Sequence, residues 1–234
     1  MKIIGVLLLS LMLFSCGVNS PDQSENINER CVNPNAAFFY PICDSARFYV
    51  YRNVSNGLDE EFHRVYKVSD SQGAHVIVER YASDGRLLEA LNYNLDSLDL
   101  MEHMVVNYKN EKEQSILYKN TLFPFNLQEE AYFSSKFRGV NDSTLILKEI
   151  KRKFNARGNI EYLNKMTETI IFKDYIRLTS LNVVEHKEEE RLGEEMAYFA
   201  KGIGLVEWHS PTKSTHFKLE KIISQKEWVK MMQK

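Results

Sequence analysis

Three cysteines and six histidines are the side chains of this sequence best suited to covalent bonding or metal binding. Cys31 and Cys43 lie twelve positions apart, and a disulfide between them would close a short loop. In the chain-entropy model, such a loop stabilises the fold by about 3 kcal/mol. The alternative is half of a metal site, but no histidine lies between or beside the two cysteines. We therefore predict a disulfide between Cys31 and Cys43.

The histidines are scattered along the chain, and no catalytic motif accompanies them. His209 and His216 could face each other across one loop, but a closed zinc site needs four ligands. The sequence has no G-x-S-x-G, H-E-x-x-H or P-loop motif, and Gly202-Ile203-Gly204 lacks the third glycine of a dinucleotide site. We expect no metal, no cofactor and no enzymatic activity. An enzyme with catalytic residues dispersed along the chain is our third choice of function.

The N-terminus has the pattern of a secretory signal. Lys2 precedes an apolar run at residues 3–14, which is too short to span a bilayer and has the length of a signal-peptide core. The sequence Leu13-Phe14-Ser15-Cys16 resembles the lipobox of bacterial lipoproteins. This resemblance implies removal of residues 1–15 as a signal peptide and acylation of Cys16, for example by palmitate. It also implies a location in the Gram-negative cell envelope, which we expect to be the outer membrane, facing the periplasm.

The mature chain is expected to have a tether followed by one folded domain. Residues 17–30 are polar and cannot bury enough apolar surface to order themselves. We assign residues 16–45 to the lipidated cysteine, the tether and the disulfide loop, and residues 46–234 to a β domain. Export would place Cys31 and Cys43 in an oxidising compartment, where disulfides persist. The formal charge of −2 argues against binding to nucleic acid through its phosphates.

Short apolar runs with approximate period-two alternation predict a mainly β fold, a single antiparallel meander of about ten strands that forms a curved sheet or half-barrel. Asn56-Gly57 and Asp84-Gly85 are typical pairs of tight hairpin turns. We also interpret Gly158 and Gly193 as turn positions between strands. The predicted strands lie at residues 48–51, 62–68, 75–81, 86–94, 115–118, 144–154, 169–178, 196–201, 205–208 and 216–223.

Two short helices are predicted. Residues 126–136 carry several apolar side chains and are expected to cross the sheet as a helix. Near the C-terminus, Ser224 and Glu227 have the spacing of a capping box, and Trp228 and Met232 then fall on one helical face. We expect this C-terminal helix to dock against the sheet.

The charge-dense residues 185–195 are interpreted as a solvated hairpin tip, with a cation site or a docking patch as the alternative. Residues 198–207 read Tyr-Phe-Ala-Lys-Gly-Ile-Gly-Leu-Val-Glu, and their two close glycines indicate a bulge or sharp bend. This stretch resembles one found in secreted lipoproteins of Gram-negative bacteria. Together with the meander, it makes the chain similar to LolA/LolB-like proteins. That resemblance implies a half-barrel wrapped over a helix, with an apolar concave face that carries lipids or lipoproteins.

We expect a lipid-anchored envelope protein that binds a lipid or another apolar ligand on the concave face of its sheet. The aromatic content of 12% on a β pattern motivates this hypothesis, although the same residues could fill a closed core. The alternative is a structural or accessory lipoprotein that binds another envelope protein. The candidate ligand-binding residues are Phe48, Val50, Tyr66, Val76, Val78, Leu91, Ile146, Ile150, Phe172, Ile176 and Phe217.

Overall fold

The computed structural model describes residues 32–43, 45–71, 73–139, 141–211 and 215–232. The predicted signal peptide, the lipidation site Cys16 and Cys31 lie outside these residues. Cys43 is a free, half-buried thiol. The structure therefore does not show the disulfide that we predicted.

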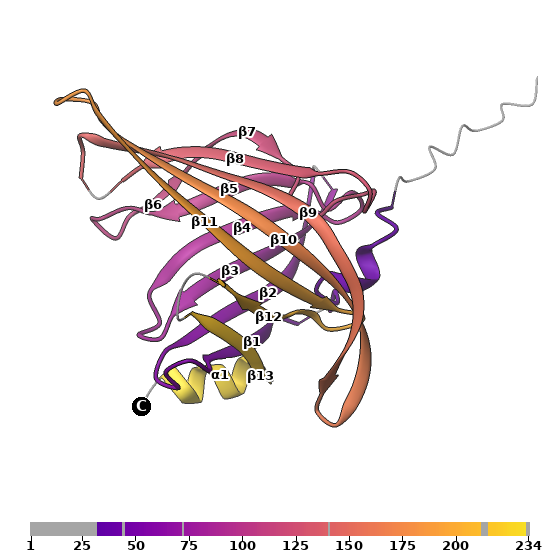
Figure 1. The fold of residues 1–234 in the computed structure, drawn as a ribbon. Coiled ribbons are helices and arrows are strands. Elements are labelled where there is room, and N and C mark those ends of the chain that lie inside the picture. Colours follow the sequence, from indigo (N-terminus) through magenta and orange to yellow (C-terminus); the bar gives the residue numbers. More distant parts are fainter. Residues whose placement is uncertain (1–31, 44, 72, 140, 212–214, 233–234) are drawn as a thin grey trace, which may run out of the picture. The chain divides into compact units, whose positions relative to one another are not determined.

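The described chain forms thirteen strands, one α-helix and one short 3-10 helix (Figure 1). The 3-10 helix η1 is Ala36–Phe38, and the α-helix α1 is Gln225–Met232. The strands are β1 Arg47–Asn53, β2 Glu60–Asp70, β3 Gly73–Ala82, β4 Leu87–Asn94, β5 Leu100–Val106, β6 Lys112–Gln114, β7 Ile116–Asn120, β8 Ala131–Arg138, β9 Thr144–Tyr162, β10 Lys165–Asn182, β11 Lys187–Ala200, β12 Gly204–His209 and β13 His216–Ser224.

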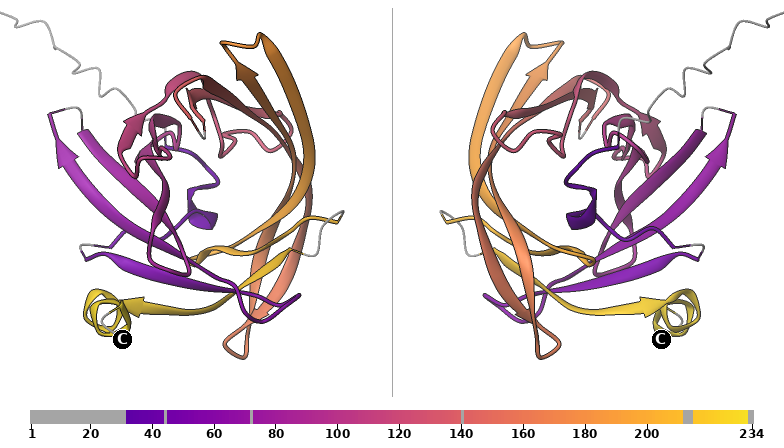
Figure 2. Two further views of the ribbon diagram at one scale, coloured as in Figure 1. Left: turned by 90° about the vertical axis from the view of Figure 1, so that its left-hand side faces the viewer. Right: turned by 90° about the vertical axis from the view of Figure 1, so that its right-hand side faces the viewer.

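All thirteen strands belong to one antiparallel sheet, which confirms the predicted fold class. The strand order is β6-β5-β4-β3-β2-β1-β13-β12-β11-β10-β9-β8-β7, so strands that are neighbours in the sequence pair with each other, except β6 and β7, and β1 pairs with β13. The two edge strands, β6 and β7, are also consecutive in the chain. The sheet curves round until β7 lies beside β5, where the Asn120 side chain donates to the carbonyl oxygen of Leu100 (3.2 Å). The result is a nearly closed barrel (Figure 2).

Three local predictions were wrong. Residues 126–136 are not a helix, because Ala131 begins β8, which pairs with both β7 and β9. Gly158 and Gly193 do not lie in turns between strands but inside β9 and β11. The strands β9 and β10 are accordingly longer than predicted, at 19 and 18 residues.

The C-terminal helix begins at the predicted capping box. The backbone N–H of Ser224 donates to the Glu227 carboxylate at 2.8 Å, and the Glu227 N–H donates to the Ser224 hydroxyl at 3.4 Å. Trp228 of α1 stacks on Phe48 and packs edge-on against Phe62. The helix therefore docks as predicted, on the face of β1 and β2 that carries Phe48 and Phe62.

The segment before β1 packs inside the curve of the sheet (Figure 2). Phe38, Phe39 and Tyr40 are each about 5% exposed and belong to the main apolar core. The Gly202 N–H donates to the carbonyl oxygen of Ala37 at 2.7 Å, which ties this segment to the turn between β11 and β12. Residues that we assigned to a disulfide loop are thus part of the folded core.

Candidate functional site

Strand alternation decides which side chains face the interior of the barrel. Because side chains alternate across a strand, every second residue of β3, β4, β9, β10 and β11 points inward. Most of these inward residues are aliphatic or aromatic, as the core cluster shows. The inward positions are interrupted by charged residues, namely Arg80, Glu89, Lys148, Arg152, Asp174, Arg191 and Glu195.

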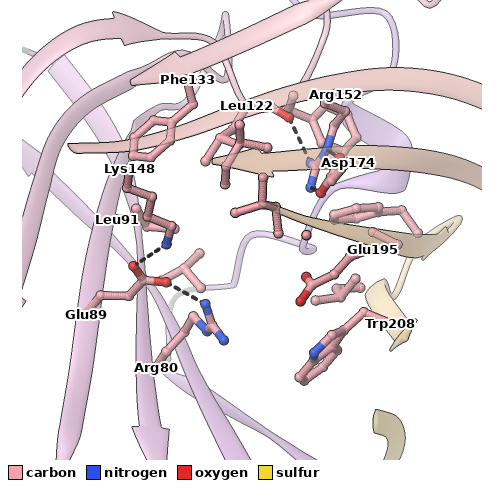
Figure 3. A pocket seen from close by; sticks show the side chains of 18 of the residues that line it. Arg80, Glu89, Leu91, Leu122, Phe133, Lys148, Arg152, Asp174, Glu195 and Trp208 are labelled. Carbon is pink, nitrogen blue, oxygen red and sulfur yellow. Dashed lines mark hydrogen bonds and ion pairs between the residues drawn. The ribbon is translucent and has the colours of Figure 1, made fainter. Parts of the chain in front are cut away.

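A cavity of about 430 Å³ lies on this inner face (Figure 3), and these seven charged residues line it together with Glu194. Its apolar walls include Leu91, Leu122, Phe133 and Trp208. A second space of about 580 Å³ runs toward the β10–β11 hairpin along the inner faces of β9, β10 and β11. The two spaces adjoin, because they share the lining residues Lys148, Leu178 and Arg191. We call the two adjoining spaces the trough.

Glu89 is the centre of the ionic network on one wall of the cavity (Figure 3). One carboxylate oxygen accepts from Arg80 Nη1, and the other accepts from Lys148 Nζ at 3.0 Å and lies 3.1 Å from His103 Nε2. Burial by itself would raise the pKa of Glu89, but the charges of Lys148 and Arg80 hold that pKa well below its ordinary value. The carboxylate is therefore ionised and has partners on both oxygens.

The network extends from Arg80 to Glu61 and His63. Arg80 Nε donates to Glu61 at 2.6 Å, and His63 Nε2 lies 2.8 Å from the same carboxylate oxygen. Burial lowers the pKa of His63, so its ring is neutral at pH 7. Because a carboxylate can only accept, Nε2 carries the proton and Nδ1 accepts from the Tyr40 hydroxyl at 2.8 Å.

Arg152 and Asp174 form a second buried ion pair on the opposite wall. Arg152 donates through Nε and Nη2 to the two oxygens of Asp174 at 2.8 and 2.7 Å, and through Nη1 to the carbonyl oxygen of Leu122 at 2.8 Å. Its guanidinium also lies over the rings of Phe172 and Phe199, 5.2 and 5.4 Å from their centroids. This bidentate geometry is the strong form of an arginine–carboxylate interaction.

The Glu61 environment predicts a loss of stability in acid. Burial would raise the pKa of Glu61, but Arg80 and His63 outweigh it and lower the pKa from 4.5 to about 2. The stabilisation from this carboxylate is therefore complete above about pH 4.5 and is lost as the pH falls toward 2. Urea unfolding between pH 6 and pH 2 measures this loss. We expect a shallower decline for Glu61→Gln than for the wild type, and equal declines would contradict the assignment.

The structure separates the predicted ligand-binding residues into three groups. Four line the cavity, and they are Val78, Leu91, Ile150 and Ile176. Four others lie elsewhere on the inner side, with Ile146 in the second space and Val76, Phe172 and Phe217 in or against the core cluster. Three lie on the opposite face, where Phe48 stacks on Trp228, Val50 follows it in strand alternation and Tyr66 packs under Arg64.

Arg80, Glu89, Lys148, Arg152 and Asp174 were not among our candidates, whereas the other charged residues of the cavity lie in the charge-dense stretch at residues 185–195. The signal of these five residues is present in the sequence, because each one continues the inward alternation of a predicted strand. Arg80 follows Val78, Glu89 precedes Leu91, and Asp174 precedes Ile176, each two positions away. Apolar patterning alone selects the aliphatic members of these rows and passes over the charged ones.

Gly193 leaves space in the wall of the cavity because it has no side chain. It lies opposite Ile176 in the β10–β11 pairing, on the inward side of β11. A Cβ atom placed on Gly193 would meet no atom within 4 Å. A glycine inside a strand weakens the strand and often marks a place where another group comes close to the backbone. The space beside Gly193 is therefore part of the room that the cavity offers.

Comparison with solved structures gives a likeness in fold. The chain is similar to a crystal structure named a "putative lipoprotein" from Parabacteroides distasonis ATCC 8503, with a TM-score of 0.50 and 14% sequence identity over 80% of this chain and 98% of that one. No protein-family model and no curated protein matches the sequence. Within the described residues, no helix combines the length and hydropathy that crossing a bilayer requires. At this identity the likeness bears on the architecture alone, which is the curved antiparallel sheet described above.

Proposed function

We propose that this chain is a lipid-anchored protein of the bacterial cell envelope that holds an amphipathic small molecule inside its barrel. The signal-like N-terminus and Cys16 support the anchoring, as does the name of the structural neighbour. The cavity on the inner face of the sheet carries the proposal of binding.

The size and walls of the cavity support a small ligand. Its volume of about 430 Å³ lies within the usual range of roughly 300–1,000 Å³ for small-molecule sites. Such sites are mostly apolar, with a few polar groups that converge on the ligand. Leu91, Phe133 and Ile150 supply the apolar surface here, and Arg80 and Lys148 are among the polar groups. A core built only for stability has less reason to carry ion pairs, because apolar packing is often as stable as a buried pair.

The presence of those charges changes the expected ligand. A concave face that carried only hydrocarbon groups would suit a wholly apolar molecule. Glu89 and Asp174 are each under 10% exposed, yet both line the cavity and both are paired with cations. A ligand with a polar end and an apolar body fits these walls better than a hydrocarbon, because it gives the remaining polar donors a partner.

Native mass spectrometry tests the proposal. The contacts from Cys31 onward form one compact unit, so residues 17–234 can be exported and purified without the lipid. We expect a noncovalent adduct of small-molecule mass, either as purified or after incubation with a bacterial lipid extract, that is lost on denaturation. A protein that stays free of adduct after this incubation would contradict the proposal.

Gly193→Phe is expected to abolish the adduct. The new ring enters open space, because no atom lies within 4 Å of the added Cβ and the backbone of Gly193 is not in the left-handed region. Glu190→Phe is the matched control, since Glu190 is exposed and lies on the other face of the same strand. We expect Glu190→Phe to keep the adduct and both variants to unfold as cooperatively as the wild type. An adduct that survives in Gly193→Phe would show that the ligand binds outside the cavity.

A further inference from the structure

We propose that the polar end of the ligand is an acidic oxygen group, a carboxylate or a phosphate, and that Arg80 and Lys148 bind it. This inference rests on the proposed function and specifies the class of ligand. Its basis is a count of the hydrogen-bonding groups that remain available on the cavity wall around Glu89 (Figure 3).

The carboxylate of this wall is already occupied. Glu89 accepts from Arg80 on one oxygen and from Lys148 on the other, where His103 also lies within hydrogen-bond distance. The network's other carboxylate, Glu61, accepts from Arg80 and His63 and is not among the residues that line the cavity. The carboxylates of this network therefore have little left to offer a ligand.

The two cations that contact Glu89, Arg80 from β3 and Lys148 from β9, keep unused donors. Among the described residues, Arg80 donates through Nε and Nη1, which leaves Nη2 without a protein acceptor. Lys148 donates one of its three N–H groups, to Glu89. The side chains of Arg80 and Lys148 are 30% and 20% exposed, whereas that of Glu89 is 11% exposed. Figure 3 shows the Arg80 guanidinium pointing into the cavity.

The position of these donors sets the orientation of the ligand. The two cations contact the two oxygens of one carboxylate and therefore lie near each other, so one oxygen-bearing head group can meet both. On the opposite wall, the Arg152–Asp174 pair is satisfied within itself, and Glu195 adds a negative charge beside it. Arg152 already donates to Asp174 and to the carbonyl oxygen of Leu122, so an acidic head finds unused donors at Arg80 and Lys148 instead.

The apolar body of the ligand then has a path along the sheet. Beyond Lys148 the trough continues between the inward side chains of β9 and β10 toward the β10–β11 hairpin. Phe137, Ile146 and Leu178 supply the apolar surface of this part, beside polar and charged side chains that include Lys187, Glu189 and Arg191. An alkyl chain that starts at Lys148 would bury its methylene groups there, each worth about 0.8 kcal/mol when fully removed from water.

Four amphiphiles with the same dodecyl chain test the head-group preference. Dodecanoate, dodecyl phosphate, dodecanol and dodecylammonium are titrated below their micelle-forming concentrations at pH 7.5, with Trp208 in the cavity wall as one of the two tryptophan reporters. We expect at least one acid to bind about tenfold or more tighter than dodecanol, and dodecylammonium to bind most weakly. The ratio of dodecanoate to dodecyl phosphate distinguishes a fatty acid from a phosphate-bearing lipid as the source.

The outcomes separate the two proposals. If none of the four compounds binds and no adduct is seen, the proposed function itself fails. If dodecanol or dodecylammonium binds as tightly as both acids, the cavity binds a ligand but does not prefer an acidic head group. In that case only this inference is overturned.

Lys148→Met gives a second, independent measurement. It removes the charge, keeps a chain of similar length and leaves Glu89 with Arg80 and His103. We expect it to reduce the preference for the acids over dodecanol by about fivefold or more while dodecanol binding is unchanged. Lys151→Met is the control, because Lys151 pairs with Glu130 on the other face of β9. Equal effects of the two substitutions would overturn the role of Lys148.

Discussion

Replacing Arg152 with methionine is expected to lower the free energy of unfolding by about 3–5 kcal/mol. The substitution leaves the carboxylate of Asp174, a residue that is 4% exposed, without its bidentate partner. It also removes the bond to the Leu122 carbonyl and the contacts with two aromatic rings. Breaking a buried pair costs more than the pair contributes, because one charge stays behind in a poorly solvated place. Urea unfolding followed by circular dichroism measures the effect.

The double variant Arg152→Met/Asp174→Leu separates the lost pair from the stranded charge. We expect it to be more stable than Arg152→Met alone, since no uncompensated charge remains. The two single substitutions and the double one make a complete double-mutant cycle. Additive losses across this cycle would mean that the two side chains do not interact in solution.

Gly204→Ala is expected to destabilise the protein by about 2–5 kcal/mol. Gly204 has φ +100°, where a residue with a side chain is strained. A Cβ atom there would lie 2.6 Å from Tyr40 Cδ1 and 3.1 Å from Tyr40 Cα. The second contact is with backbone, so a rotation of the tyrosine ring cannot relieve it. The unfolding midpoint in urea reports the loss.

Gly73→Ala is the matched control for this prediction. Gly73 has φ +119°, but an added Cβ would meet nothing within 4 Å. We expect Gly73→Ala to carry only the backbone strain and so to lose less stability than Gly204→Ala. A loss of equal size in the two variants would show that the contact between Gly204 and Tyr40 has no energetic weight.

The sequence predicted the class of the fold because its strong signals are local. Asn56-Gly57 and Asp84-Gly85 fall at turns between consecutive strands, where both glycines have positive φ. Ser224 and Glu227 cap the one α-helix of the described chain. The bend expected at Gly202 and Gly204 is the turn between β11 and β12. Each of these features is set by residues a few positions apart.

The predictions that failed depend on partners far away in the chain. The apolar spacing at residues 126–136 suits a helix, but from Ala131 onward alternate residues face the core and the chain is paired on both sides. Likewise, Lys148 and Glu89 meet only because the sheet closes on itself, and they are 59 positions apart. The local sequence pattern predicts which side chains point inward, but it does not predict which distant residues they contact.

The pairing of β1 with β13 has a consequence for the order in which this chain can fold. Arg47 pairs with Ser224, so β1 cannot complete its pairing before β13 has been synthesised. The hairpins from β2 to β5 can form early from neighbouring segments, whereas closure joins distant parts of the chain and is correspondingly slow. Until then β1 has an unpaired edge, and its aromatic residues, which are buried in the folded protein, remain exposed. Such an edge is a site for association with other chains. A ribosome or export channel that releases the chain N-terminus first therefore delivers the closing strand last.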